Sequence, residues 1–162
     1  MSAIDHLLHA NLAYATTFPG PRPLRPKLRL AVVACMDSRL DLFGALGLDI
    51  GDAHLIRNAG GLPTDDVLRS LAVSQRNLGT REVVLIHHTE CGMQGFDDVA
   101  FRAELAAESG EVPPWDVPGF TDIHATMRRS MKVVRECRWL PHRDDVRGFI
   151  FDISTARLEE VV

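Results

Sequence analysis

The chain has 162 residues, a length that suits one domain with a sizeable core, so we expect a single domain over residues 1–162. Its 18 basic and 22 acidic residues give a net charge of −4, and it has no Lys/Arg cluster interleaved with aromatic residues, which argues against a nucleic-acid partner. The N-terminus lacks the basic and apolar regions of a secretion signal, and no apolar run approaches the roughly 20 residues of a membrane span. We therefore expect a cytoplasmic protein with no membrane contact.

An amphipathic helix is predicted for residues 3 to 14, where apolar residues recur at helical spacing: Ile4, Leu7, Leu8 and Leu12. The following segment, FPGPRPLRP, holds four of the nine prolines and should be extended. We therefore predict that residues 1–26 form an arm that stands off from the body and that a partner subunit could receive. The alternative is that the arm folds back on its own core.

Strands and helices should alternate along the rest of the chain. Aliphatic runs predict buried strands at LRLAVVA from Leu28, AHLIRNA from Ala53, EVVLIH from Glu82 and VRGFIFDI from Val146, with RLEEVV returning as an antiparallel edge. Helices are predicted for residues 40–46, 97–108 and 122–136. Another helix should lie between Thr64, which can cap its start, and Gly79, which is placed to end it. This order predicts an α/β fold with a mainly parallel central sheet of four strands, an antiparallel edge strand and helices on both faces.

Three residues with metal-ligand side chains follow the ends of two predicted strands. Cys35 follows the first strand, and His88 and Cys91 follow the strand that starts at Glu82. In parallel sheets ligands bind beyond the carboxyl ends of the strands, so these segments can meet at one ion if their strands are neighbours. Two thiolates and one imidazole suit Zn²⁺, and three protein ligands leave a position for water, as in catalytic zinc sites. Three cysteines are also too few, and too odd in number, for a disulfide framework. We predict one Zn²⁺ per chain and hydration or hydrolytic chemistry.

Asp37 and Arg39 lie two and four residues after Cys35. If Arg39 binds Asp37 in bidentate geometry, Asp37 can orient the zinc-bound hydroxide that attacks the substrate. Without that bond, Asp37 could swing onto zinc and displace the water, so this aspartate could act as orienter or as plug. Because two thiolates offset the charge of zinc, the bound water should be less acidic than in a three-histidine site, where its pKa is about 7. Activity should then rise toward alkaline pH.

The segments CMDSR, RNAGG and HHTECGM resemble the signature segments of the β-class carbonic anhydrases. The resemblance implies reversible hydration of CO₂ to bicarbonate and a proton, with Cys35, His88 and Cys91 as zinc ligands and Asp37 and Arg39 as the catalytic dyad. It also implies the compact, mostly microbial form of the family, and a homodimer or higher homo-oligomer with active sites near subunit interfaces.

Three positions depart from the commoner family pattern. His87 stands where glycine usually precedes the ligand histidine, Glu90 stands where aspartate often follows it, and Gly61 stands where RNAG usually continues with asparagine. None of these departures removes a ligand. We interpret His87 as a packed or hydrogen-bonded side chain, because it should point to the opposite side from its neighbour on the strand.

Two other functions fit the same residues. Hydrolysis of carbonyl sulfide or carbon disulfide would keep the fold and the zinc and change only the substrate. A non-catalytic zinc-binding module would have Asp37 permanently in the fourth position, although Arg39 offers that carboxylate another partner. His54 and His124 could relay protons, but no pattern fixes their distance from the zinc, and Cys137 is interpreted as a structural thiol.

Overall fold

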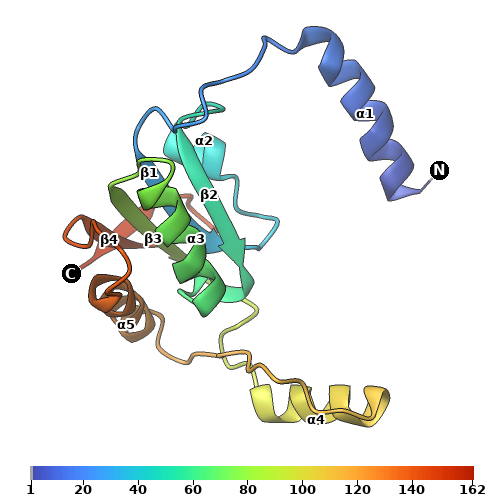
Figure 1. Ribbon diagram of the computed structural model, residues 1–162. Coiled ribbons are helices and arrows are strands. Elements are labelled where there is room, and N and C mark those ends of the chain that lie inside the picture. The colour runs from blue at the N-terminus through green and yellow to red at the C-terminus, as the bar shows by residue number, and fades with distance from the viewer. Residues whose placement is uncertain (1) are drawn as a thin grey trace.

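The computed structural model describes residues 2–162, so Met1 of the predicted arm lies outside the described residues. The elements in chain order are α1 (Ala3–Thr17), β1 (Leu30–Cys35), α2 (Leu42–Leu46), β2 (Ala53–Asn58), the short 3₁₀ turn η1 (Ala59–Gly61), α3 (Asp65–Arg76), β3 (Glu82–His88), α4 (Asp98–Ser109), α5 (Ile123–Glu136), β4 (Val146–Phe151) and β5 (Leu158–Val161). Strands and helices alternate as the sequence predicts, and the α/β class is confirmed (Figure 1).

One sheet has the strand order β2-β1-β3-β4-β5. The first four strands are parallel, and β5 pairs antiparallel with β4 at the edge, as predicted. The strand β1 therefore lies between β2 and β3, and the carboxyl ends of these three strands lie at the same edge of the sheet. This order makes the strands that carry the predicted ligands neighbours.

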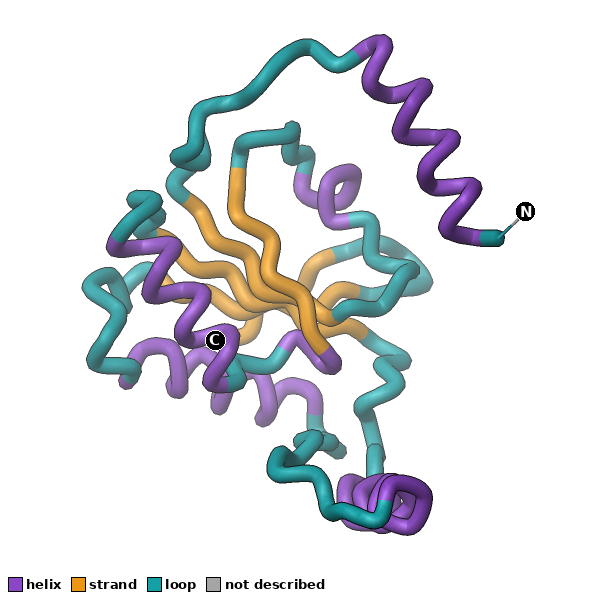
Figure 2. Tube along the Cα trace, turned by 45° about the vertical axis from the view of Figure 1, so that its right-hand side comes forward, coloured by secondary structure: helices purple, strands orange, loops and turns teal. Residues whose placement is uncertain are grey.

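Both faces of the sheet are covered, by different elements. On one face, alternate strand residues such as Val33 and Leu85 pack against α3 and α5, which both lie on this side of the sheet (Figure 2). On the other face, Val32 and Ile86 pack against α2 and against side chains of irregular segments, among them Phe120. Strands buried on both faces need apolar residues at every position, which explains the uninterrupted aliphatic composition of β1.

The helices α1 and α4 stand off from the sheet (Figure 1). The helix α1 starts at a capping box, in which Ser2 Oγ accepts from Asp5 N at 3.1 Å and Asp5 Oδ2 accepts from Ser2 N at 2.8 Å. It is one turn longer than predicted, and no residue of it is buried within the described chain. An extended segment joins α1 to β1, so the arm does not fold back on its own core (Figures 1 and 2).

Two local predictions about α3 were wrong. Thr64 occupies the N-cap position, but its side chain makes no capping hydrogen bond and instead lies 3.4 Å from Asn58 Nδ2. The helix ends at Arg76 with Asn77 as its cap, before Gly79 is reached. Among the helices of residues 2–162, none is long and apolar enough to cross a bilayer.

Candidate metal centre

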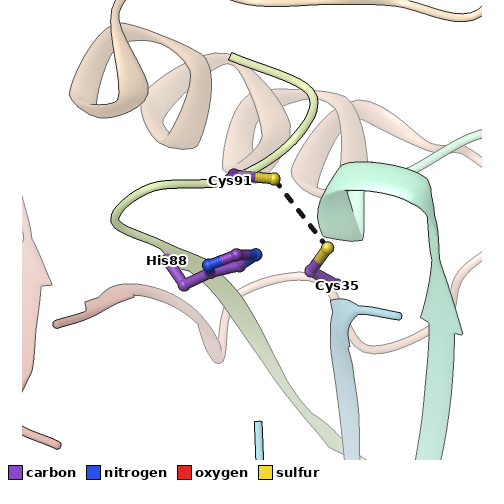
Figure 3. Close-up of side chains that lie close together, drawn as sticks. All are labelled: Cys35, His88 and Cys91. Atoms are coloured by element: carbon purple, nitrogen blue, oxygen red, sulfur yellow. Dashed lines mark hydrogen bonds between the residues drawn. The ribbon is translucent and has the colours of Figure 1, made fainter. Parts of the chain in front are cut away.

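Cys35, His88 and Cys91 come together at the carboxyl ends of β1 and β3 (Figure 3). Cys35 is the last residue of β1, His88 is the last residue of β3, and Cys91 lies in the turn that follows. The two strands pair in parallel register up to Ala34 and Ile86, which places their ends side by side. All three ligand side chains are buried, with exposed fractions of 4%, 0% and 6% respectively.

The spacing of the donor atoms suits a tetrahedral zinc site. The sulfur atoms of Cys35 and Cys91 are 3.9 Å apart, and all three ligand atoms lie within 4.8 Å of one another. Two thiolates bound at about 2.3 Å with tetrahedral angles place their sulfurs about 3.8 Å apart. The distance between the two sulfurs therefore already matches that of a zinc-binding pair.

His88 presents one ring nitrogen to the two sulfurs. Its Nδ1 donates to the carbonyl oxygen of Thr89 at 2.9 Å, which leaves Nε2 as the nitrogen with a free lone pair. This Nε2 is buried and has no hydrogen-bond partner among residues 2–162. A histidine whose other nitrogen is bonded to a backbone carbonyl is the usual arrangement of a metal ligand. The buried, unpartnered Nε2 thus fits a site for a cation.

Burial raises the pKa of the Cys91 thiol to about 11, and the nearby Cys35 thiol adds to this effect. The thiol is therefore protonated at neutral pH when no cation is present. A zinc ion deprotonates a coordinating thiol and compensates the charge of two adjacent thiolates. The chemistry of this donor set, two buried thiols and one imidazole, fits Zn²⁺.

The carboxylate of Asp37 lies beside these donors and is bound by Arg39. Asp37 Oδ1 accepts from Arg39 N and Nε, both at 2.9 Å, and Oδ2 accepts from Nη2 at 2.7 Å. These bonds hold the pKa of Asp37 well below its usual range. The same Oδ2 atom is 3.7 Å from His88 Nε2. The sequence-predicted dyad is thus bidentate and adjacent to the metal donors.

Glu90 also contacts the Arg39 guanidinium and shares its Nη2 with Asp37. Arg39 Nη2 donates to the backbone carbonyl of Glu90 at 3.1 Å, and Nη1 is 3.8 Å from its carboxylate. The backbone of Glu90 is in the left-handed region, with φ of 56°, which is uncommon for a residue other than glycine. Glu90 therefore contributes to the environment of the dyad, a contact that the sequence did not indicate.

The segment after β2 packs closely against the ligand strands. A Cβ atom on Gly61 would lie 2.7 Å from Cys35 N and 2.9 Å from Ile86 O, and its φ is +66°, so the position suits glycine alone. Asn58 is also part of this packing, because its carbonyl accepts from Met36 N at 2.8 Å. The glycine at the end of RNAGG makes this close approach possible.

The other residues that the sequence analysis considered lie outside the metal centre or face away from it. His87 is fully buried, stacks on Phe120 with ring centroids 6.0 Å apart, and neither ring nitrogen has a hydrogen-bond partner in residues 2–162. Its side chain is packed, and burial lowers its pKa to about 4. Cys137 caps the C-terminus of α5 and is buried in the core, and His124 contacts Glu159 at 3.2 Å.

His54 does not reach the metal centre from its place on β2. It pairs with Ala31, four residues before Cys35, which corresponds to roughly 13 Å along the strand. Its Nδ1 is bonded to Ser74 Oγ at 2.7 Å. The structure thus offers no support for a proton relay through His54.

Known proteins resemble this chain in sequence and in structure. Residues 30–115 match the carbonic anhydrase family. The chain is 45% identical over 161 residues to the beta-carbonic anhydrase 1 of Mycobacterium bovis, covering 99% of both chains. The crystal structure of carbonic anhydrase from Streptococcus mutans superposes with a TM-score of 0.92 at 42% identity, covering 100% of this chain and 99% of that one. A carbon disulfide hydrolase of Acidithiobacillus thiooxidans is 36% identical over 151 residues, covering 80% of this chain and 75% of that protein.

Proposed function

Because this chain belongs to the β-class carbonic anhydrases, we propose that it is a zinc enzyme that catalyses the reversible hydration of CO₂ to bicarbonate and a proton. The observation that carries the proposal is the position of the Asp37 carboxylate, which is bound by Arg39 and lies 3.7 Å from the buried Nε2 of His88. A purely structural zinc site has four protein ligands and no need for such a pair.

Cys35, His88 and Cys91 would hold the zinc ion, one per chain. When bound, Zn²⁺ lowers the pKa of water and so would supply the nucleophile. The three protein groups provide the ion with two negative charges and one neutral nitrogen. Their burial excludes bulk water from the donor side of the ion.

Asp37 would orient the attacking oxygen. Because its pKa is held well below the usual range, the carboxylate is ionised at neutral pH and can only accept hydrogen bonds. The attacking oxygen must therefore turn its hydrogen toward Asp37, which leaves a lone pair directed at CO₂. Arg39 would keep the carboxylate in that position, because its rigid fork binds both oxygens.

Stopped-flow CO₂ hydration with a pH indicator tests this function. The zinc-loaded protein, measured from neutral to alkaline pH, should accelerate hydration, with rates that rise as the pH increases. The same protein stripped of metal by a chelator is the control and should be inactive. Protein that contains zinc but hydrates CO₂ no faster than buffer at any pH would refute the proposal.

Hydrolysis of carbon disulfide is the second candidate. The similarity to a carbon disulfide hydrolase at 36% identity favours it, although that similarity covers less of the chain than the similarity to the mycobacterial carbonic anhydrase. Release of sulfide from carbon disulfide by the same zinc-loaded protein, without CO₂ turnover, would select this second function.

A homodimer is the assembly that we propose, with α1 received by a second copy of the chain. The apolar residues of α1 are 63–69% exposed in the single chain: Ile4, Leu7, Leu8 and Leu12. The accessible surface of 10470 Å² also exceeds the roughly 8000 Å² expected for a compact monomer of 18.0 kDa. A partner that covers α1 would remove much of this excess.

We also propose a cytoplasmic location and a single functional domain. Three free thiols, two of them in the donor set, suit a reducing compartment. The two strands that carry ligands belong to the same five-stranded sheet, so the metal centre depends on one folded unit.

A further inference from the structure

Arg57 makes a set of contacts that the mechanism above does not use. It lies near the carboxyl end of β2, and its guanidinium donates to three backbone carbonyls of the segment that leaves β1. The bonds run from Nε to Cys35 O at 2.9 Å, from Nη2 to Asp37 O at 2.6 Å and from Nη1 to Leu40 O at 3.3 Å. A single side chain thus contacts the backbone of a zinc ligand and of the orienting aspartate.

The segment from residue 36 to residue 41 lies between β1 and α2 and has no regular structure of its own. Its own backbone contributes one hydrogen bond, from Leu40 N to Asp37 O at 3.1 Å. The direction in which the Asp37 side chain leaves the backbone depends on how these peptide groups are held. Arg57 fixes them from one side, and the bond from Met36 N to Asn58 O fixes the adjoining peptide.

Arg57 is directed at carbonyls rather than at a carboxylate. The ion pairs formed within residues 2–162 include Arg39, Arg69, Arg102 and Arg147, but not Arg57. Hydrogen bonds from a charged donor are stronger than neutral ones, and the planar guanidinium fixes the relative positions of the groups that it binds. A lysine at this position would keep the charge but could not reproduce a three-point contact.

We propose that Arg57 is a positioning residue for CO₂ hydration, which holds the backbone of residues 35–40 so that the Asp37–Arg39 pair faces the metal donors. The proposal rests on the proposed function of this site. Arg57 acts through the segment that it binds and makes no contact of its own with the reacting atoms. The arginine of RNAGG thereby has a physical reason to lie on a strand adjacent to the ligand strand.

The test uses zinc-loaded Arg57→Ala and Arg57→Lys, with Arg76→Ala as the matched control. Arg76 also donates to a backbone carbonyl, that of Trp139 at 2.9 Å, but at the far end of α3. We expect kcat of Arg57→Ala to fall roughly 10- to 100-fold, the cost of a small misplacement of reacting groups, with KM changed less and zinc retained. Arg57→Lys should recover little of this loss, and Arg76→Ala should match the natural protein.

Added guanidinium separates a positioning role from a general loss of stability. Low millimolar guanidinium chloride should raise the kcat of Arg57→Ala several-fold, while ammonium chloride at the same ionic strength should leave it unchanged. Unchanged kcat in Arg57→Ala would overturn the proposal. So would a loss that guanidinium does not restore, or one that Arg57→Lys fully repairs.

Amide hydrogen exchange gives a readout that does not depend on activity. Peptides that span residues 35–41 should exchange faster in Arg57→Ala and Arg57→Lys, while peptides of α5 should be unchanged. If the natural protein hydrates CO₂ but exchange at residues 35–41 does not change, the inference about Arg57 fails and the function stands. If the natural protein does not hydrate CO₂, the proposed function fails and the catalytic role of Arg57 fails with it, whereas exchange still decides whether Arg57 holds the segment.

Discussion

Arg39 donates three hydrogen bonds to the carboxylate of Asp37, two from its guanidinium and one from its backbone, at distances of 2.7–2.9 Å. The two residues are separated by one position in the sequence, so the pair is formed within a single turn. The side chain of Arg39 is 48% exposed, and that of Asp37 is 16% exposed. An ion pair that solvent reaches on the arginine side contributes little to stability, so its importance should appear in the reaction rather than in folding.

Arg39→Ala removes the guanidinium bonds that hold the Asp37 carboxylate in its orientation beside the metal donors. We expect kcat/KM for CO₂ hydration to fall about 100-fold while zinc content and the thermal midpoint stay close to those of the natural protein. Arg69→Ala removes another Asp–Arg pair, with Asp66 on α3, and should leave activity unchanged. Equal rates in the two variants would remove Arg39 from the mechanism.

Substitution of either ligand cysteine should abolish zinc binding. Cys35→Ser and Cys91→Ser each replace a soft thiolate with a hydroxyl, which zinc binds poorly. Zinc content measured by elemental analysis should fall from one ion per chain to well below one half. Cys137→Ser provides the matched control, because Cys137 is equally buried but lies in the core, away from the donor set. Full zinc content in Cys35→Ser or Cys91→Ser would contradict the assigned ligand set.

Gly61→Ala should destabilise the fold more than the same substitution at another glycine that has a similar backbone conformation. Gly61 and Gly47 have φ values of +66° and +63°, but only at Gly61 would a Cβ meet other atoms, within 2.9 Å of the ligand strands. We expect Gly47→Ala to cost roughly 1 kcal/mol for the left-handed backbone. Gly61→Ala should cost about 1–3 kcal/mol more because of overpacking. Urea unfolding of the zinc-loaded variants measures both values, and equal losses would show that the packing at Gly61 can relax.

The composition of the two ligand strands predicted them accurately, whereas the cap and the end of α3 were predicted wrongly. The aliphatic run before Cys35 and the run before His88 predict buried strands, and their consecutive aliphatic residues predict burial on both faces. The rule that ligands gather at the carboxyl ends of parallel strands then predicted that two distant segments meet. The local spacing also indicated the Asp37–Arg39 pair, because both residues lie in one turn.

The contacts that the sequence could not predict depend on strand order. The contact between Arg57 and the backbone of Cys35 exists because β2 pairs with β1 so that Asn58 lies opposite Cys35. No pattern within RNAGG indicates which strand will be its neighbour. The stacking of His87 on Phe120 likewise joins β3 to a segment more than thirty positions later, whereas alternation along the strand predicted only the direction of His87.

His87 should make the protein sensitive to acid. Burial lowers its pKa to about 4, against the usual 6.5 of a histidine, so the folded state disfavours the charged imidazole. The contribution of neutral His87 to the free energy of unfolding is therefore complete above about pH 6.5. It is lost as the pH falls toward and through 4, by up to about 3 kcal/mol. His87→Phe keeps a flat ring against Phe120 and cannot be protonated. Chemical unfolding at several pH values should show a shallower acid loss in His87→Phe, and parallel curves for the two proteins would contradict this cause.

Charge on the apolar face of α1 should dissociate the proposed dimer. Leu8 is 63% exposed in the single chain and lies on the same helix face as Ile4, Leu7 and Leu12, so a partner that receives α1 must bury it. Leu8→Glu would then place an unpaired charge in an apolar interface, at a cost of several kcal/mol. Ala13→Glu adds the same charge on the opposite helix face and is the matched control.

Analytical ultracentrifugation at micromolar concentration should find the natural protein and Ala13→Glu at about twice the chain mass of 18.0 kDa, and Leu8→Glu at the mass of one chain. An assembly that survives Leu8→Glu unchanged would mean that α1 is not the element through which the two copies associate, because an unpaired charge buried in an apolar interface lowers affinity.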